Sequence, residues 1–225
     1  MLFLAVFCGT LAEYWLEHRI EHNREREFME SLAQDLQSDI NEIDSSLALG
    51  NLVNSKADTL VKLLNDLPVK PESVPTLYRL STESSRIFDV PFEDRTSSQL
   101  KNAGGMRLIR NRPVADSIRN YWSMIVQLQG ITSRVDYTAD KGGVLSAQIF
   151  HTKYFGVRDP QNPLRTPPVM PDARLITNDP STLSQYANWK YYRRVLSLNY
   201  IKRLKEARAQ AVSLIALIHE QYHLE

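Results

Sequence analysis

Apolar residues at helical spacing dominate the first third of the chain. They recur every three or four positions, at Phe28, Leu32, Leu36, Ile40, Ile43 and Leu47, and the pattern continues to Leu64. This spacing places the apolar side chains on one face of a helix. Proline is absent until Pro68. The pattern predicts one helix of about 55 residues, from Ala12 to Asp66, and a helix of that length is typical of a coiled coil, a membrane-emergent stalk or a long hairpin.

Shorter helices are predicted in the middle of the chain. They span Val74–Ser85, Ser97–Ala103, a stretch that restarts at Asn111-Arg112-Pro113, and Val144–Tyr154. Gly104-Gly105 follows the second of these helices, as glycine commonly does after a helix end. Proline is tolerated in the first turn of a helix, which agrees with Pro113 at the start of the third. Gly142-Gly143 is expected to separate the last two.

The last part of the chain is predicted to form a loop followed by a long helix. Six of the eleven prolines lie between Gly156 and Pro180, so this stretch is predicted to be an extended loop. Asp179-Pro180 forms a suitable cap and first turn for a helix that continues to Tyr222. The predicted fold is therefore an all-α, elongated bundle or hairpin. Its long N-terminal helix runs antiparallel to its long C-terminal helix, and shorter helices lie between them.

The chain opens with an uncharged apolar stretch, Leu2–Ala12, which is too short to span a bilayer. One interpretation is an apolar helix end buried in the protein or in an oligomer. The other is the outer part, residues 1–16, of a transmembrane helix that begins upstream of Met1. Tyr14 and Trp15 favour the second interpretation, because such aromatic rings gather at the membrane interface. Residues 17–225 are then expected to form a single helical domain.

Composition narrows the possible functions. The 225 residues carry 27 Lys and Arg against 26 Asp and Glu. The resulting net charge of +1 is too small to select an anionic polymer as a partner. A single cysteine excludes an intrachain disulfide framework. Residues 13–45 hold ten acidic residues and three arginines, whereas residues 186–210 hold seven basic residues and one glutamate. We interpret these segments as complementary helices, with a basic face for lipid headgroups or an anionic partner as the alternative. No nucleic-acid partner and no cofactor are expected.

A basic segment surrounds the Gly104-Gly105 pair. Its four bases are Lys101, Arg107, Arg110 and Arg112. Guanidinium groups and the amides of a helix start can bind an anion. The segment lacks the GK[ST] ending of a phosphate-binding loop, so nucleotide binding is not supported. It predicts either a small-anion or partner site, or a joint between helices whose bases face the acidic first helix.

Histidine pairs occur near both ends of the chain. His219 and His223 belong to an HExxH string, which can bind zinc on a helix with Glu220 as a general base. No third ligand follows before Glu225. His18 and His22 form the inverted HxxEH pattern. We expect no metal site, and a site made of these two pairs is the alternative.

The order of these features resembles a known family. Three segments resemble an uncharacterised family of bacterial single-pass membrane proteins. They are the aromatic end of the apolar stretch at residues 11–15, the long charged helix from Arg24 to Leu64, and the segment TSSQLKNAGGMRLI at residues 96–109. The resemblance implies a short cytoplasmic N-terminus, an inner-membrane helix and a periplasmic helical domain of unknown function. It carries over no catalytic residues. This chain departs from the family in starting inside the expected membrane helix.

Three functions are compatible with the sequence. The first is a membrane-anchored helical interaction or scaffold module without catalysis, which binds another envelope protein or self-associates. The alternative is a sensor-like ectodomain that binds a small anionic ligand at the basic segment. The third is a zinc hydrolase that uses His219, Glu220 and His223.

Overall fold

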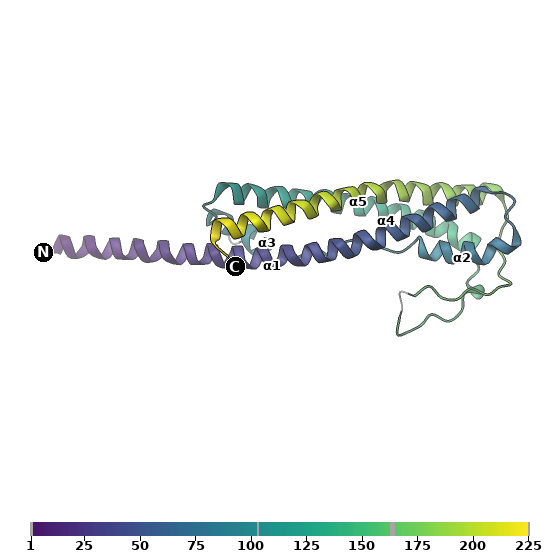
Figure 1. Ribbon diagram of the computed structural model, residues 1–225, viewed down its shortest axis with the longest axis horizontal. Coiled ribbons are helices and arrows are strands. Elements are labelled where there is room, and N and C mark those ends of the chain that lie inside the picture. Colours follow the sequence, from purple (N-terminus) through teal and green to yellow (C-terminus); the bar gives the residue numbers. More distant parts are fainter. Residues whose placement is uncertain (1, 103, 163–164, 225) are drawn as a thin grey trace. The chain divides into compact units, whose positions relative to one another are not determined.

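The computed structural model describes residues 2–102, 104–162 and 165–224, with side chains from residue 6 onwards. Five α-helices account for most of this part of the chain: α1 (Leu2–Asn65), α2 (Val74–Glu83), α3 (Arg95–Asn102), α4 (Arg112–Ile149) and α5 (Pro180–Tyr222) (Figure 1). Short 3₁₀ turns lie at Pro71–Ser73, Gly105–Arg107 and Thr152–Tyr154. The described residues contain isolated β-bridges but no strand. The all-α prediction is confirmed, and α1 packs against α5 and α4.

The chain forms two compact units, each with its own core. Unit 1 comprises residues 1–43, 90–125 and 205–225, and unit 2 comprises residues 44–89 and 126–204. Helices α1, α4 and α5 each contribute one portion to unit 1 and another to unit 2. In unit 1, Tyr222 of α5 reaches Glu25 of α1, and in unit 2, Arg194 of α5 pairs with Asp58 of α1. The higher-numbered α5 residue meets the lower-numbered α1 residue, so the two helices run antiparallel, as predicted.

The core of unit 1 is built on the apolar face that the sequence predicts for α1. Its buried apolar side chains come from all three segments of the unit: Met29, Leu32, Leu36, Ile40, Ile43, Leu100, Ile109, Val114, Ile118, Tyr121, Leu214 and Ile218. Burial of a side chain of this size stabilises a fold by roughly 1.5–3 kcal/mol. Helix α1 packs against α5 and α4, and hydrogen bonds from Arg95 and Thr96 join α3 to it. Ala207 and Ala211 of α5 are completely buried.

The core of unit 2 surrounds Tyr78 of α2, which is completely buried. Its ring contacts Phe150 and Phe155 edge to face, with centroids 4.8 and 5.1 Å apart. Its hydroxyl donates to the carbonyl of Arg174 at 2.8 Å and accepts from the amide of His151, also at 2.8 Å. The rest of the cluster is apolar and comes from four helices and a loop: Leu60, Leu64, Val74, Leu77, Leu80, Ile149, Ala173, Leu183 and Ala187, with Tyr186 beside them.

Two helix ends follow the predicted local chemistry. Gly104 follows α3 with φ +69°, a left-handed conformation that glycine adopts without a steric penalty. Asp179 precedes α5, and its carboxylate accepts from the amide and hydroxyl of Thr182 at 2.9 and 2.7 Å. These bonds hold the pKa of Asp179 below its usual range. Ala103, which the sequence places at the end of the second short helix, lies outside the described residues.

The prediction of separate helices on either side of Gly142-Gly143 is wrong. Helix α4 continues through both glycines to Ile149, so the helices between α1 and α5 are not all short. Glycine costs about 1 kcal/mol relative to alanine inside a helix. Thr138 and Ile149 are buried on either side of the pair. Packing of these flanking turns therefore outweighs the local preference of two glycines.

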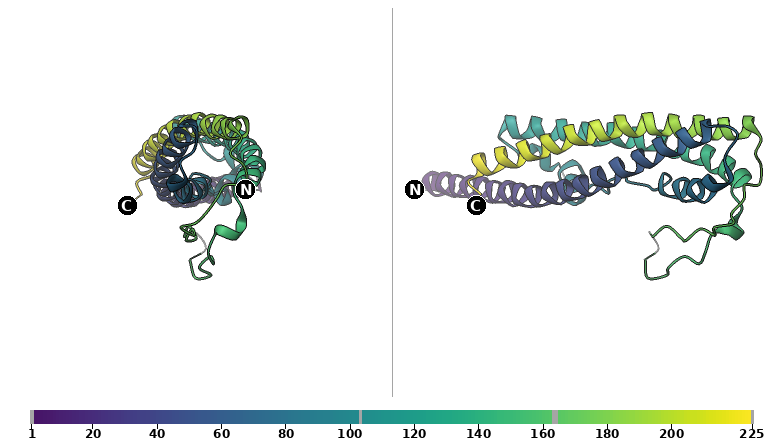
Figure 2. Two further views of the ribbon diagram at one scale, coloured as in Figure 1. Left: turned by 90° about the vertical axis from the view of Figure 1, so that its right-hand side faces the viewer. Right: turned by 45° about the vertical axis from the view of Figure 1, so that its right-hand side comes forward.

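The proline-rich segment between α4 and α5 forms a loop, as predicted for residues 156–180. Figure 2 shows it projecting from the helices of unit 2 in both views. Pro163, one of its prolines, lies outside the described residues together with Leu164. The loop is fastened at its base by two antiparallel bridges, Phe155 with Val169 and Phe150 with Leu175.

Candidate functional site

The C-terminal end of α2 is held by two buried cations from α5, which we call the α2 clamp. Lys190 Nζ lies 2.6 Å from Ser85 Oγ and 3.2 Å from Ser84 Oγ. Arg193 donates to the carbonyl of Ser84 at 2.6 Å and to that of Arg86 at 2.8 Å. The last carbonyls of a helix lack intrahelical partners and carry partial negative charge. The clamp therefore supplies hydrogen-bond donors from both side chains, and positive charge from the guanidinium of Arg193, where the end of α2 needs them.

Burial shapes the chemistry of the α2 clamp. Lys190 and Arg193 are 6% and 5% exposed, and none of the ion pairs in the described residues involves either side chain. Burial, reinforced by the charge of Arg193, lowers the pKa of Lys190 to about 7. Burial also lowers the pKa of Arg193 and raises that of Tyr186 to about 12. A lysine that is partly neutral at physiological pH is therefore set against two serine hydroxyls.

Two cavities adjoin the α2 clamp within unit 2. One has a volume of about 400 Å³ and is lined by Lys190, Arg193, Ser85 and Trp189 among others. The second, of about 330 Å³, shares Ser85 and Arg193 and also has Asp136 in its wall. Ser85 is exposed, although the lysine that it contacts is buried. The pair is therefore accessible mainly through Ser85, and Lys190 contributes to the wall of the first cavity.

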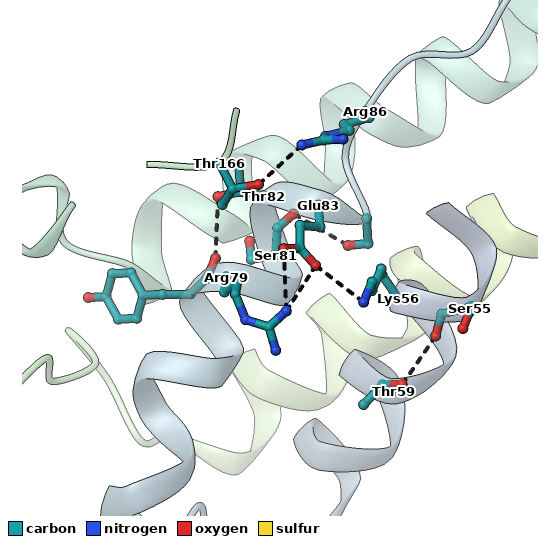
Figure 3. Close-up of polar contacts among 11 residues, drawn as sticks. Ser55, Lys56, Thr59, Arg79, Ser81, Thr82, Glu83, Arg86 and Thr166 are labelled. Atoms are coloured by element: carbon teal, nitrogen blue, oxygen red, sulfur yellow. Dashed lines mark hydrogen bonds and ion pairs between the residues drawn. The ribbon is translucent and has the colours of Figure 1, made fainter. Parts of the chain in front are cut away.

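The opposite side of α2 carries ordinary surface ion pairs. Figure 3 shows Glu83 between Arg79 and Lys56, and Arg86 reaching the hydroxyl of Thr166. Glu83 lies 3.2 Å from Arg79 and 3.7 Å from Lys56. The contact from Arg86 to Thr166 is 3.3 Å long and ties the proline-rich loop to the end of α2. Pairs this exposed contribute little to stability. This side of α2 therefore differs from the clamp, where the cations are desolvated.

Unit 1 contains a second polar arrangement, a row of three buried carboxylates on α1. Glu25, Asp35 and Asp39 are each less than 5% exposed. They accept hydrogen bonds from the backbone amides of Arg110, Thr96 and Glu93, at 2.8, 3.0 and 2.8 Å respectively.

Each of the three carboxylates also has a side-chain partner. Arg95 pairs with Asp35, Tyr121 donates to Asp39, and Tyr222 donates to Glu25. These carboxylates dock residues 93–110 onto α1.

Asp39 is the most perturbed member of the row. Burial raises its pKa to about 6, against the bonds from the Glu93 amide and the Tyr121 hydroxyl, and the charges of Glu93 and Asp35 add to the increase. Burial beside Asp39 in turn raises the pKa of Tyr121. The folded state therefore binds this proton more tightly than the unfolded chain does between about pH 4 and pH 6.

We expect Asp39→Asn to remove one component of the pH dependence of folding. Because the folded pKa is raised, wild-type stability falls as pH rises from about 4 to 6, by roughly 1–2 kcal/mol through this group. The neutral side-chain amide of the variant keeps an acceptor for the backbone amide of Glu93. The stability of the variant should therefore not show that fall with pH. Urea unfolding between pH 4 and pH 7 measures the difference, with Asp116→Asn on the exposed face of α4 as the control. Parallel pH curves for Asp39→Asn and wild type would contradict this assignment.

The four bases of the predicted anion site contact different groups. Lys101 lies over the ring of Trp122, 4.4 Å from its centroid, and the Arg107 guanidinium lies against Gly104. Arg110 pairs with Glu21 at 2.8 Å and contacts a ring nitrogen of His18 at 3.0 Å. Arg112 is exposed at the start of α4. Arg110 thus faces the acidic first helix, as the helix-joint interpretation expects, and anion binding by the other three stays a prediction.

The histidines are not assembled into a metal centre in the described residues, where no group of three potential ligands is found. His219 and His223 line a surface cavity with Arg26 and Glu30. Helix α5 ends at Tyr222, and His223 follows it with φ +49°. The two histidines therefore lack the helical i, i+4 arrangement on which the HExxH motif depends. His22 is exposed on α1, one turn beyond His18.

The first turns of α1 make up the third notable feature, and we call residues 6–16 the apolar end. Every side chain from residue 6 to residue 24 is exposed, with Tyr14 at 70% and Trp15 at 63%. Tyr14 stacks on His18, and Arg19 lies over the ring of Trp15. Among the described residues no helix is both long and apolar enough to cross a membrane.

Sequence reasoning found the apolar end but missed the α2 clamp. The sequence places Lys190 and Arg193 in the basic segment of residues 186–210, and a helical pattern does not reveal which of its bases are buried. Their partners are serine hydroxyls and carbonyls more than 100 residues away in the chain. The consecutive serines at the end of α2 were the only local signal, and serine is common at helix ends.

No protein-family model matches this chain, and no curated protein or solved structure gives a significant match.

Proposed function

We propose that this chain is a membrane-anchored helical interaction module, held at the bilayer by the apolar end of α1. The observation that supports the proposal is the distribution of apolar side chains around the helix. Successive helical residues are about 100° apart, so Val6, Phe7, Trp15 and Leu16 point to four different sides. All four are more than half exposed. A partner helix covers one stripe, whereas lipid covers every side.

The interfacial chemistry of the following turn supports the same proposal. Tyr14 and Trp15 carry polar atoms on apolar rings, a combination that is favoured where hydrocarbon meets water. Glu17 and Arg19 follow directly and stay in solvent. With the family resemblance, this supports an inner-membrane location with the helical units on the periplasmic side.

An exposed stripe on α5 gives such a module a surface for a protein partner or a second copy. Tyr191, Val195 and Leu198 lie at helical spacing on α5 and are 55%, 43% and 43% exposed. They belong to unit 2, whereas the apolar end belongs to unit 1. The anchor and the interaction surface are therefore separate features of the chain.

We expect the combined change Val6→Glu, Phe7→Glu and Leu11→Glu to release the chain from lipid. Each apolar side chain removed from water contributes roughly 1.5 kcal/mol or more, so the loss of three such side chains should lower partition on the order of 1,000-fold. Flotation with vesicles of phosphatidylethanolamine and phosphatidylglycerol measures it. The matched control is Ile87→Glu, Val126→Glu and Val144→Glu, three positions of unit 2 that are at least as exposed. Equal flotation of both triple variants would overturn the anchor.

A further inference from the structure

One of the two shortest contacts in the α2 clamp joins a nucleophilic group to a potential base. Ser85 Oγ lies 2.6 Å from Lys190 Nζ, and Ser84 Oγ lies 3.2 Å from the same nitrogen. Ser85 is exposed and contributes to the walls of three cavities of unit 2, whereas Lys190 is buried. A serine with an adjacent base within hydrogen-bond distance is the arrangement that nucleophilic catalysis requires.

We propose that Ser85 is a nucleophile activated by Lys190, and that unit 2 transfers or hydrolyses the acyl group of an anionic ester. This activity goes beyond the proposed membrane-anchored module and does not depend on it.

The surroundings of Lys190 favour its neutral form, as a general base requires. The positive charge of Arg193 acts against protonation of Lys190, and the Tyr186 ring lies 5.4 Å from Lys190 Nζ. Asp140 lines the same cavity but forms no ion pair with Lys190. Burial lowers the lysine pKa to about 7, so the free amine is well populated near neutral pH. General bases act best with a pKa close to the working pH.

The Ser85 proton can move to Lys190 without rearrangement of the backbone. The hydroxyl now donates to the carbonyl of Ser81 at 2.7 Å. When Lys190 is neutral, its lone pair offers a second acceptor at 2.6 Å. Ser84 Oγ accepts from the same amine and so keeps Lys190 Nζ in place. Rotation about one side-chain bond of Ser85 is sufficient to exchange these acceptors.

The reaction is balanced without an external oxidant or reductant. Ser85 Oγ attacks the carbonyl carbon of the ester and passes its proton to Lys190 Nζ. The bond from the carbonyl carbon to the alkoxide then breaks, and Lys190 returns the proton to the departing alkoxide, which leaves as an alcohol. Water repeats the sequence on the acyl–Ser85 ester, which releases a carboxylic acid and restores the hydroxyl.

The class of substrate follows from a third cavity, of about 510 Å³, that also includes Ser85. Arg86, Arg158 and Arg165 line it together with Thr82 and Thr166, and no carboxylate is among its described lining residues. Guanidinium groups pair with carboxylates and phosphates through two parallel hydrogen bonds. An ester with a negatively charged acyl chain could place its charge in this cavity and its carbonyl beside Ser85.

A fluorophosphonate probe tests the nucleophile directly. We expect mass spectrometry of the labelled chain to locate the phosphonate on Ser85, at a rate that rises with pH through a midpoint near 7. Ser85→Ala should abolish labelling, and Ser55→Ala, an exposed serine of α1, should leave it unchanged. Lys190→Met should lower the rate by roughly 100-fold or more, because general-base assistance is worth about that much.

Each alternative outcome is decisive. Absence of label on Ser85 between pH 6 and pH 9, or an unchanged rate in Lys190→Met, would overturn the proposal. If Lys190→Met proves unfolded by circular dichroism, the wild-type rate profile decides, because a serine without a base would show no midpoint near pH 7. For the substrate class, p-nitrophenyl esters with and without a terminal carboxylate are compared in wild type and Arg165→Gln. Equal rates on both esters in the wild type would exclude the anionic preference.

Discussion

Replacing Tyr78 with alanine is expected to unfold unit 2 under conditions in which the wild-type chain stays folded. The side chain is completely buried and fills the space between α2 and the aromatic cluster at the end of α4. Removal of a buried aromatic side chain costs roughly 3–5 kcal/mol. The change also leaves the His151 amide and the Arg174 carbonyl without the hydroxyl that joins them, at roughly 1–3 kcal/mol each. The total approaches the whole stability of a typical domain.

Two variants make the Tyr78 prediction specific. Tyr78→Phe keeps the ring, so it should lose only the part of the stability that the hydroxyl contributes. Tyr191→Ala removes the same atoms from a position that is 55% exposed and should change stability by less than about 0.5 kcal/mol. Urea unfolding followed by circular dichroism measures all three, and hydrogen exchange locates the loss in unit 2. A Tyr78→Ala chain with wild-type protection in α2 would refute the central position of this residue.

The second large effect is expected in the pH dependence that Lys190 confers on folding. Its folded pKa of about 7 lies below the ordinary value of 10.5. Between these values the unfolded chain binds more protons than the folded chain, so stability rises with pH over this range. For a single group with these values the gain is roughly 2 kcal/mol between pH 7 and pH 9.

Lys190→Met separates this contribution from that of other groups. Methionine has a similar straight side chain and no charge, so the rise in stability between pH 7 and pH 9 should be smaller by that amount. Arg193, Tyr186 and the hydroxyls of Ser84 and Ser85 face the lysine, and the raised pKa of Tyr186, about 12, keeps its hydroxyl protonated over this range. Lys202→Met on the exposed face of α5 serves as the control. A variant whose stability rises as steeply as that of the wild type would show that Lys190 is not desolvated.

The fold illustrates which interactions a pattern of residues can reveal. The apolar stripe of α1 predicted both the long helix and its buried face, because helical periodicity and burial have the same physical origin. Gly104 and Asp179 marked helix ends through conformational and hydrogen-bonding preferences that act over three or four residues. The break predicted at Gly142-Gly143 failed because packing of the flanking turns outweighs a local cost of this size.

The candidate sites show the opposite case. Glu25, Asp35 and Asp39 look like part of a solvated acidic face, yet in unit 1 they accept bonds from backbone amides of residues 93–110. Backbone amides carry no mark in a sequence, so this docking could not be predicted. Lys190 and Ser85 lie 105 positions apart, and neither residue type is unusual in its helix.

The sequence by itself determined the helical class, the antiparallel order of α1 and α5, the capped helix ends and the uncharged apolar start. The helical class, the capped ends and the apolar start depend on propensities, periodicity or composition within a few turns of the chain, whereas the antiparallel order was suggested by the opposite charges of residues 13–45 and 186–210. Only the tertiary structure decided which charged residues are buried and what they contact. Desolvation and hydrogen bonding depend on groups that approach from distant segments, and these contacts distinguish the lysine of the α2 clamp from the solvated lysines of the same helix.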